Sequence, residues 1–243
     1  MMIQTNMPSM MRSTLSCTLL AAGLFTLSSA HAVRPLITDD AAVNDRGQCQ
    51  IEVWQERTQG VRGPTLAPAC GIADGLEFGV SYTRYSPASA DAGGYGLQLK
   101  TVFESIKTER WAFGAKLNTV SVHNRFTRGY SPDEYSVTLL GSGKYGNGLS
   151  LHTNLGVAHD RTASETSATY GVAVVQEFGQ AGFVFAELTG NHRSGAFRNA
   201  GAAVWLIPER LSIDFSAGRK NGGGGSTEYT IGLGFYGTKV FGQ

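Results

Sequence analysis

The chain has 243 residues, including 32 glycines, and its 20 Lys and Arg against 19 Asp and Glu give a formal net charge of +1. A balance this close to neutral provides no broad basic field, which argues against a nucleic-acid partner. After residue 32 no stretch approaches the roughly 18 apolar residues of a membrane-spanning helix, and the length suits a single all-β domain.

The first 32 residues have the features of an export signal. Arg12 supplies a positive flank, an apolar run extends from Leu15 to Leu27, and Ala30-His31-Ala32 places small residues before a cleavage site. The run is too short to cross a bilayer as a helix. We therefore predict that residues 1–32 are a signal peptide and that the mature protein is exported.

Residues 33–47 are polar and irregular, and we predict a periplasmic lead-in to the folded domain. Asp39, Asp40 and Asp45 lie in this segment. Their spacing does not match a calcium-binding loop, so we expect these carboxylates to be solvated or to cap the chain. The pattern leaves open whether the segment fills the interior of the domain.

Cys49 and Cys70 remain after signal cleavage. An even pair of cysteines in an exported protein indicates a disulfide. The alternative is a metal-binding or catalytic thiol, but no cluster of Cys and His accompanies the pair. We predict a disulfide and no metal or cofactor.

From residue 48 onward, apolar and polar side chains alternate with the period of two that marks a half-buried strand. In one such segment Leu76, Phe78, Val80 and Tyr82 alternate with Glu77, Gly79, Ser81 and Thr83. The predicted strands lie near residues 48–57, 65–72, 76–83, 95–104, 111–118, 135–139, 149–157, 167–177, 182–190, 197–206, 211–218 and 229–235. The first two, the ninth and the tenth of these segments alternate less regularly. In the ninth, Phe183 and Phe185 lie on the same face as Glu187.

The connections sort into short turns near 73–75, 105–109, 143–148, 178–181 and 207–210, and longer loops near 57–64, 85–94, 120–134, 159–167, 190–196 and 219–228. Bacterial outer-membrane barrels have this arrangement, with an even number of strands. We therefore predict an all-β fold, a transmembrane antiparallel β-barrel of about twelve strands over residues 48–243, with periplasmic termini. A soluble sandwich or lipocalin-like barrel alternates too, but it hides its apolar face inside.

Three short motifs carry a family resemblance. Residues 34–40 (Arg-Pro-Leu-Ile-Thr-Asp-Asp), residues 47–52 (Gly-Gln-Cys-Gln-Ile-Glu) and Pro68-Ala69-Cys70 resemble a family of Gram-negative outer-membrane barrels that is tied by name to the MetA pathway of phenol degradation. The resemblance implies that the two cysteines join the first two strands. It also implies passive passage of small, often apolar or aromatic, molecules.

The polar faces of the predicted strands carry charges that would line the barrel interior. The candidate lining residues are Glu77, Lys100, Glu104, Lys116, His152, Glu187 and Asp214, with Glu52 and Glu177 as further members. Rings of charge can select solutes. Mixed signs also suit mutual pairing inside a narrow barrel, and the sequence favours neither interpretation.

An enzyme and an interaction barrel are the alternatives to a channel. Ser150 and His152 point the same way on one strand, as in a lipid-modifying enzyme, but no acid can be placed to orient the imidazole. We therefore predict a monomeric small-molecule channel without enzymatic activity. Its other partners are outer-membrane lipid and lipopolysaccharide, which His123, Arg125 and Arg128 in a long loop could contact.

Overall fold

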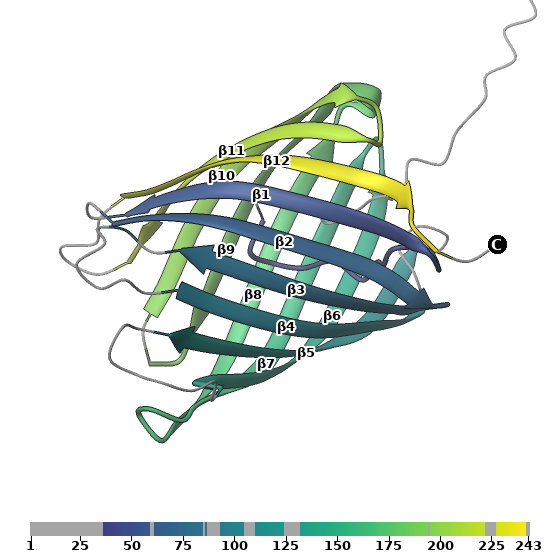
Figure 1. Cartoon of the computed structure of the whole chain (residues 1–243). Coiled ribbons are helices and arrows are strands. Elements are labelled where there is room, and N and C mark those ends of the chain that lie inside the picture. Colours follow the sequence, from purple (N-terminus) through teal and green to yellow (C-terminus); the bar gives the residue numbers. More distant parts are fainter. Residues whose placement is uncertain are drawn as a thin grey trace, which may run out of the picture.

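The computed structural model describes residues 36–58, 61–84, 86, 93–104, 110–123, 132–193, 195–221 and 227–241. The predicted signal peptide, and with it cleavage after Ala32, lies outside the described residues. The strands form one closed barrel in which each is hydrogen-bonded to its sequence neighbours and β1 closes on β12. Figure 1 shows the barrel from the side. No described helix is long and apolar enough to cross a bilayer.

The strands agree with the predicted segments and extend most of them. They are β1 (Gln48–Thr58), β2 (Val61–Ala73), β3 (Leu76–Arg84), β4 (Gly93–Glu104), β5 (Trp111–His123), β6 (Glu134–Gly146), β7 (Leu149–Asp160), β8 (Glu165–Glu177), β9 (Gly182–Asn191), β10 (Gly195–Ile207), β11 (Leu211–Lys220) and β12 (Thr227–Lys239). A short 3₁₀ turn, η1 (Gly179–Ala181), precedes β9. All neighbouring pairs are antiparallel, so every backbone ladder closes without a free edge.

The apolar face of the barrel points outward. Leu155 and Ile231 are 64% and 56% exposed, whereas His152 and Lys100 are each 4% exposed. A soluble barrel would show the reverse, because its apolar side chains fill the interior. The fold is therefore a transmembrane β-barrel with a lipid-facing apolar belt and a polar interior.

The ninth strand resolves the ambiguity in its sequence. Phe183 and Phe185 are buried on the same inward face as Glu187, while Val184 and Leu188 face outward. The two phenylalanines join an interior apolar cluster with Val175 of β8, Ala203 of β10 and Tyr236 of β12. The out-of-pattern apolar residues therefore line part of the interior.

The contrast in length between the two sets of connections is smaller than predicted. The loop expected at 57–64 shrinks to residues 59–60, because Arg57 pairs with Arg62 and extends the first hairpin. The loop expected at 190–196 shrinks to 192–194 in the same way. The polar side chains of these two hairpins do not interrupt the strands, because the backbone N–H and C=O groups of the paired strands remain hydrogen-bonded to each other. Arg125 and Arg128 lie outside the described residues.

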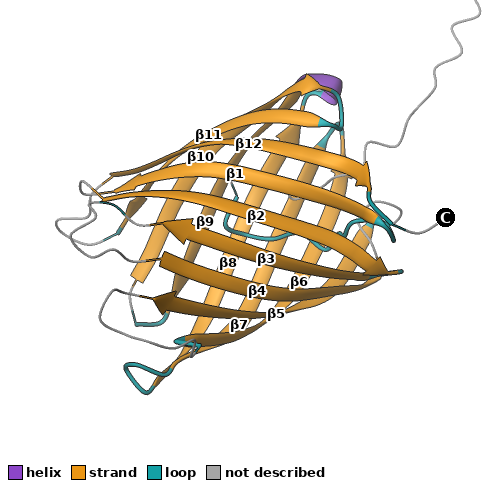
Figure 2. Ribbon diagram, viewed as in Figure 1, coloured by secondary structure: helices purple, strands orange, loops and turns teal. Residues whose placement is uncertain are grey.

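The first strand begins and the last strand ends at the same end of the barrel, where Gln48 of β1 pairs with Lys239 of β12. We assign this end to the periplasm, because the connections at 85–92 and 124–133 lie at the opposite end. Residues 36–46, expected as a periplasmic lead-in, instead lie inside the barrel and form hydrogen bonds to its wall. Figure 2 shows this loop between the near and far strands.

Cys49 of β1 and Cys70 of β2 are directly paired and form a disulfide near the periplasmic end. The bridge closes the first hairpin over a sequence separation of 21 residues. Closing a loop of this size stabilises the folded state by about 3 kcal/mol in the chain-entropy model.

We expect the Cys49→Ala/Cys70→Ala variant to lose about this free energy of unfolding. Urea unfolding of the refolded protein in detergent measures the loss as a lower midpoint. Wild-type protein in reductant is the control and should match the variant. An unchanged midpoint for both would show that the closed hairpin is already ordered in the unfolded ensemble.

Candidate functional site

The candidate site is the barrel interior and the chain that occupies it. We call residues 36–46 the interior segment. Its backbone is held by side chains from opposite sides of the barrel, so it crosses the lumen rather than following one wall (Figure 2). Each contact satisfies a backbone group that would otherwise be buried without a partner.

Strands β9 and β7 hold the backbone at the start of the interior segment. The Glu187 carboxylate of β9 accepts hydrogen bonds from the backbone N–H groups of Ile37 and Thr38, the latter at 2.7 Å. Asn154 of β7 accepts from the N–H of Asp39 and donates to its carbonyl oxygen, both at 2.8 Å. This two-way match fixes the position of the Asp39 side chain.

The Ser142 hydroxyl of β6 accepts a hydrogen bond of 2.9 Å from the N–H of Ala41. Ser142 also contacts Nδ1 of His152, whose Nε2 contacts the hydroxyl of Ser150. Both imidazole nitrogens therefore face serine hydroxyls, and the described hydrogen bonds give His152 no orienting carboxylate. This network positions the interior segment through Ser142.

Two lysines form the electrostatic centre of the site. Lys100 of β4 lies 2.7 Å from Asp39 and 3.1 Å from Asp40, and Lys116 of β5 lies 2.9 Å from Asp39. The Asp40 side chain is 1% exposed, whereas those of Asp39 and Lys116 are 17% and 21% exposed. The site therefore has a sealed ion pair, Lys100–Asp40, and a more accessible one, Lys116–Asp39, and the contact between Lys100 and Asp39 links the two.

Asp39 belongs to the interior segment and not to a membrane-spanning strand. Burial by itself would raise the pKa of its carboxyl group, but Lys100 and Lys116 outweigh that effect and hold the pKa well below its ordinary value. Asp39 is therefore an anion throughout the physiological pH range. It occupies a position where two ammonium groups converge on one carboxylate.

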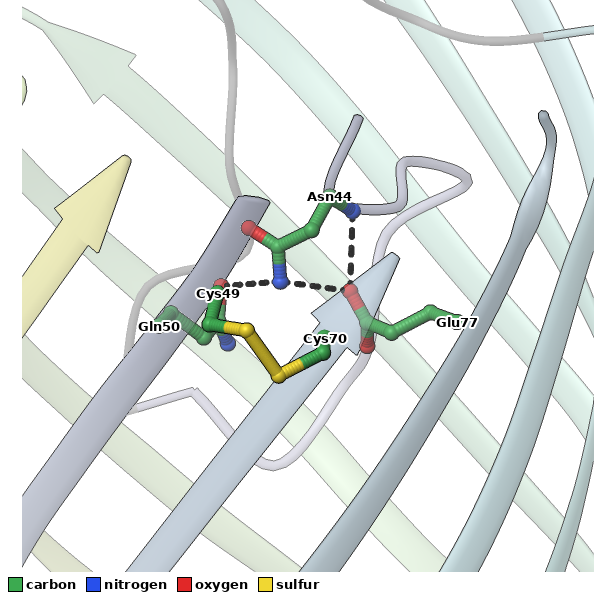
Figure 3. Close-up of a disulfide and its surroundings, with 5 residues drawn as sticks. All are labelled: Asn44, Cys49, Gln50, Cys70 and Glu77. Carbon is green, nitrogen blue, oxygen red and sulfur yellow. Dashed lines mark hydrogen bonds between the residues drawn. A yellow bond between two sulfur atoms is a disulfide. The ribbon is translucent and has the colours of Figure 1, made fainter. Parts of the chain in front are cut away.

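The end of the interior segment is fastened beside the disulfide (Figure 3). Asn44 donates to the Glu77 carboxylate of β3 through both its backbone N–H and its side-chain amide, and the amide also reaches Gln50. Gly71 of β2 permits this approach, because a Cβ atom there would lie 2.2 Å from the carbonyl oxygen of Asn44. Close backbone contact thus requires glycine at position 71.

The start of the interior segment contacts an apolar wall. Leu36 packs against the interior apolar cluster, which is joined by Trp205 of β10. The Trp205 and Tyr236 rings are 5.5 Å apart and meet edge to face. The interior segment thus has an apolar side chain against an aromatic wall and, three residues later, a carboxylate against two lysines.

A cavity of about 320 Å³ remains between the interior segment and strands β1–β5. Asp39, Lys100 and Lys116 line it together with Gln98 and Asn118. The exposed ion pair therefore borders the space that a solute can occupy. Among the described residues no group of three His, Cys, Asp or Glu side chains could hold a metal ion.

The structure brings most of the predicted lining residues together. Glu77, Lys100, His152, Glu187 and Asp214 are buried, and Lys116 is half-buried against Asp39. Glu104 is not among them. A bulge after Val102 pairs Glu104 with the outward-facing Phe113, so Glu104 is exposed at the end of its strand.

The acidic partners of the two lumen lysines differ from those expected from the sequence. Asp39 and Asp40 were expected to be solvated, but they are the acids that neutralise Lys100 and Lys116. The sequence signal for these partners was the presence of two lysines, Lys100 and Lys116, on the inward faces of adjacent predicted strands. Glu77 pairs with Lys100 in the strand register, yet it is occupied by Asn44.

A family model described as "Uncharacterised conserved protein UCP029691" matches residues 20–235. The chain belongs to this family. The match spans the interior segment and all but the last residues of β12. It does not support the more specific resemblance of the opening motifs to the MetA-pathway family. No curated protein matches the chain in sequence.

Solved outer-membrane barrels share the fold of this family member. The KdgM porin matches with a TM-score of 0.61 at 13% identity, over 76% of this chain and 98% of its own. The NanC porin matches with a TM-score of 0.59 at 8% identity, over 77% and 98%. The outer membrane protein Omp33 of Acinetobacter baumannii matches with a TM-score of 0.51 at 10% identity, over 80% and 100%. Identities this low establish the fold alone.

Proposed function

We propose that the protein is an outer-membrane channel for small solutes and that the interior segment closes it. The observation that carries the proposal is a lipid-facing barrel whose polar lumen is crossed by a separate stretch of chain. Apart from a bridge between Arg46 and Gly71, that stretch is held by side-chain hydrogen bonds and ion pairs and forms no part of the barrel ladder. It can therefore leave without breaking the strand pairing. The protein acts as a monomer in the outer membrane.

The contacts of the interior segment indicate the class of solute. Leu36 covers the aromatic wall, and the Asp39 carboxylate lies between two lysines. A solute with a carboxylate and an aromatic or branched apolar group would satisfy both walls in its place. Three residues span at most about 10 Å of extended chain, which sets the size of this solute.

Two further points support this function. The KdgM structures are of a porin, one of them in complex with oligogalacturonate. The aromatic wall formed by Trp205 and Tyr236 beside Leu36 suits an apolar or aromatic group. Because the lumen has both an apolar wall and two lysines close together, it favours a solute with an apolar group and a carboxylate over a solute with only one of these groups.

Ligand-dependent opening tests the proposal. We expect 4-hydroxybenzoate, added to the outer side of a planar bilayer that holds the protein, to raise the frequency of channel opening. Neutral 4-hydroxybenzyl alcohol is the matched control and should have no effect. Lys116→Met should remove the response, because the accessible ion pair is the entry point for a competing carboxylate.

The outcomes separate the channel from its solute. If the channel opens equally often with and without the added carboxylate, the channel function stands and the proposed solute class is rejected. If the protein shows no conductance, and liposomes that contain it never swell faster than empty ones, the channel itself is rejected.

A further inference from the structure

Two side-chain amides lie next to the lysine pair on the barrel wall. Gln98 of β4 and Asn118 of β5 are directly paired in the strand register, as are Lys100 and Lys116. Inward-facing positions on a strand are two residues apart, so these strands carry a row of two amides beside a row of two ammonium groups. The amide row lies nearer the outer end of the barrel, because β4 runs toward the periplasm and β5 runs away from it.

The two amide groups are available to a ligand in the cavity between the interior segment and strands β1–β5. Gln98 and Asn118 are both half-buried and both line this cavity, and no other described residue is hydrogen-bonded to either amide. A side-chain amide carries donors and an acceptor, so two adjacent amides can donate to and accept from one hydroxyl group. The amide row is therefore suited to a neutral hydroxyl.

Glycine at position 79 makes room for the Gln98 side chain. Gly79 of β3 is paired with Gln98, and a Cβ atom there would lie 2.8 Å from both Cγ and Nε2 of that side chain. Carbon atoms in favourable contact are about 3.5–4.0 Å apart, so a larger residue would push the Gln98 amide away from β3. The position of this amide in the cavity thus depends on the glycine.

Lys116 provides a charged group at the other end of the same stretch of wall. Its side chain is 21% exposed, and its hydrogen bond to Asp39 uses one of the three donors of the ammonium group. The Lys100 side chain is only 5% exposed. Glu52 and Glu77 also line the cavity, so a carboxylate is favoured beside Lys116 and not elsewhere along the wall. A carboxylate that arrives from outside therefore meets Lys116 first.

The interior segment presents an apolar side chain to the same cavity. Ile37 is one of the lining residues and is 52% exposed. Trp54 of β1 lines the cavity too and adds an aromatic surface. Covering an exposed apolar side chain with an apolar group removes both from water, which is favourable. The cavity thus combines one cationic group, one pair of amides and an apolar surface.

We propose that Gln98 and Asn118 recognise a hydroxyl group at the far end of an incoming aromatic carboxylate whose charged end lies on Lys116. The inference rests on the proposed solute class and adds a group that the solute must carry. Two residues along a strand span about 6.8 Å, which sets the separation between the hydroxyl and the carboxylate. A hydroxyl para to the carboxylate on a benzene ring fits this separation, whereas ortho and meta hydroxyls lie closer to the carboxylate. The ring lies against Ile37.

Equilibrium binding to the folded protein in detergent tests the proposal without any measurement of conductance. Isothermal titration calorimetry would compare 4-hydroxybenzoate with 3-hydroxybenzoate and benzoate, which share the ring and the carboxylate. We expect wild type to bind 4-hydroxybenzoate about tenfold more tightly than the other two, because its hydroxyl gains neutral hydrogen bonds to both amides. The Gln98→Met/Asn118→Leu variant should bind all three ligands equally, since Lys116 is still present.

Two further variants separate the amides from the rest of the lumen. Gly79→Ala removes no polar group but displaces the Gln98 amide, so it should lose part of the preference for 4-hydroxybenzoate. Thr189→Val is the matched control, because it is a polar-to-apolar change at a buried position on β9 that does not line the cavity. It should keep the full preference. The gel-mobility shift of unheated samples verifies that each variant is folded.

The outcomes distinguish this inference from the function on which it rests. If wild type binds 4-hydroxybenzoate no more tightly than benzoate or 3-hydroxybenzoate, the hydroxyl site is overturned and the carboxylate channel stands. An unchanged preference in the Gln98→Met/Asn118→Leu variant overturns the hydroxyl site in the same way. If none of the three carboxylates binds, the proposed solute class and this inference are both rejected.

Discussion

Deletion of residues 36–46 is expected to turn a closed barrel into an open one. In planar bilayers, wild type should show rare openings and the deletion variant continuous, stepwise conductance. The reason is that the interior segment crosses the lumen between Glu187 on one side and Glu77 on the other. The barrel should survive, because none of its ladder pairs involves these residues except the bridge from Arg46 to Gly71.

A locked variant provides the opposite test. The backbone N–H of Ala41 donates a hydrogen bond of 2.9 Å to the Ser142 hydroxyl, so cysteines at both positions would tether the interior segment to β6. We expect Ala41→Cys/Ser142→Cys to stay closed until a reductant is added. Reductant also opens the native Cys49–Cys70 bridge, so wild type in the same reductant is the necessary control.

The deletion and the lock must give opposite results if the interior segment is the barrier. A deletion variant that is folded but no more conductive than wild type would place the barrier elsewhere in the lumen. The interior apolar cluster of Val175, Phe183, Phe185, Ala203 and Tyr236 would then be the candidate.

Lys100→Met is expected to release the interior segment without shortening the chain. Methionine fills a similar volume but leaves Asp40 without its ion pair and Asp39 with Lys116 alone. Removing one partner of a buried pair costs about 3–5 kcal/mol. We therefore expect hydrogen exchange in residues 36–46 to become faster by ~2–4 orders of magnitude, since each 1.4 kcal/mol is a factor of ten.

Two variants show whether charge is the cause. Lys116→Met should have a smaller effect, because its pair with Asp39 is partly exposed and Asp39 keeps Lys100. Asp40→Asn/Lys100→Met should recover part of the protection, since the uncompensated carboxylate is gone. If Lys100→Met and Lys116→Met accelerate exchange equally, the sealed pair does not hold the interior segment. Exchange in the β7 and β8 strands serves as the internal reference.

The barrel could be predicted because its physical signal is local and repeated. Alternation such as that of Leu76, Phe78, Val80 and Tyr82 needs no knowledge of distant residues, and closure follows from the rule that no backbone group is left unpaired in lipid. The cysteine pair is local in the same sense, because one hairpin brings Cys49 and Cys70 together. The exceptions also have local causes, such as the bulge that removes Glu104 from the lumen.

The contents of the lumen could not be predicted because they depend on contacts between distant parts of the chain. Asp39 meets Lys100 and Lys116, and Ile37 meets Glu187, 150 residues away. An irregular segment has no periodicity that records where it lies. Its position follows from the inner faces of several strands, which exist as a surface only once the barrel has closed.

The sequence by itself therefore determined the barrel, its lipid-facing side and its disulfide, because each depends on neighbouring residues along the chain or on one hairpin. Only the tertiary structure decided that the predicted periplasmic lead-in crosses the lumen and that its two aspartates meet Lys100 and Lys116. Closure of the sheet brings the inner faces of distant strands around one common space. Sequence spacing carries no trace of that proximity.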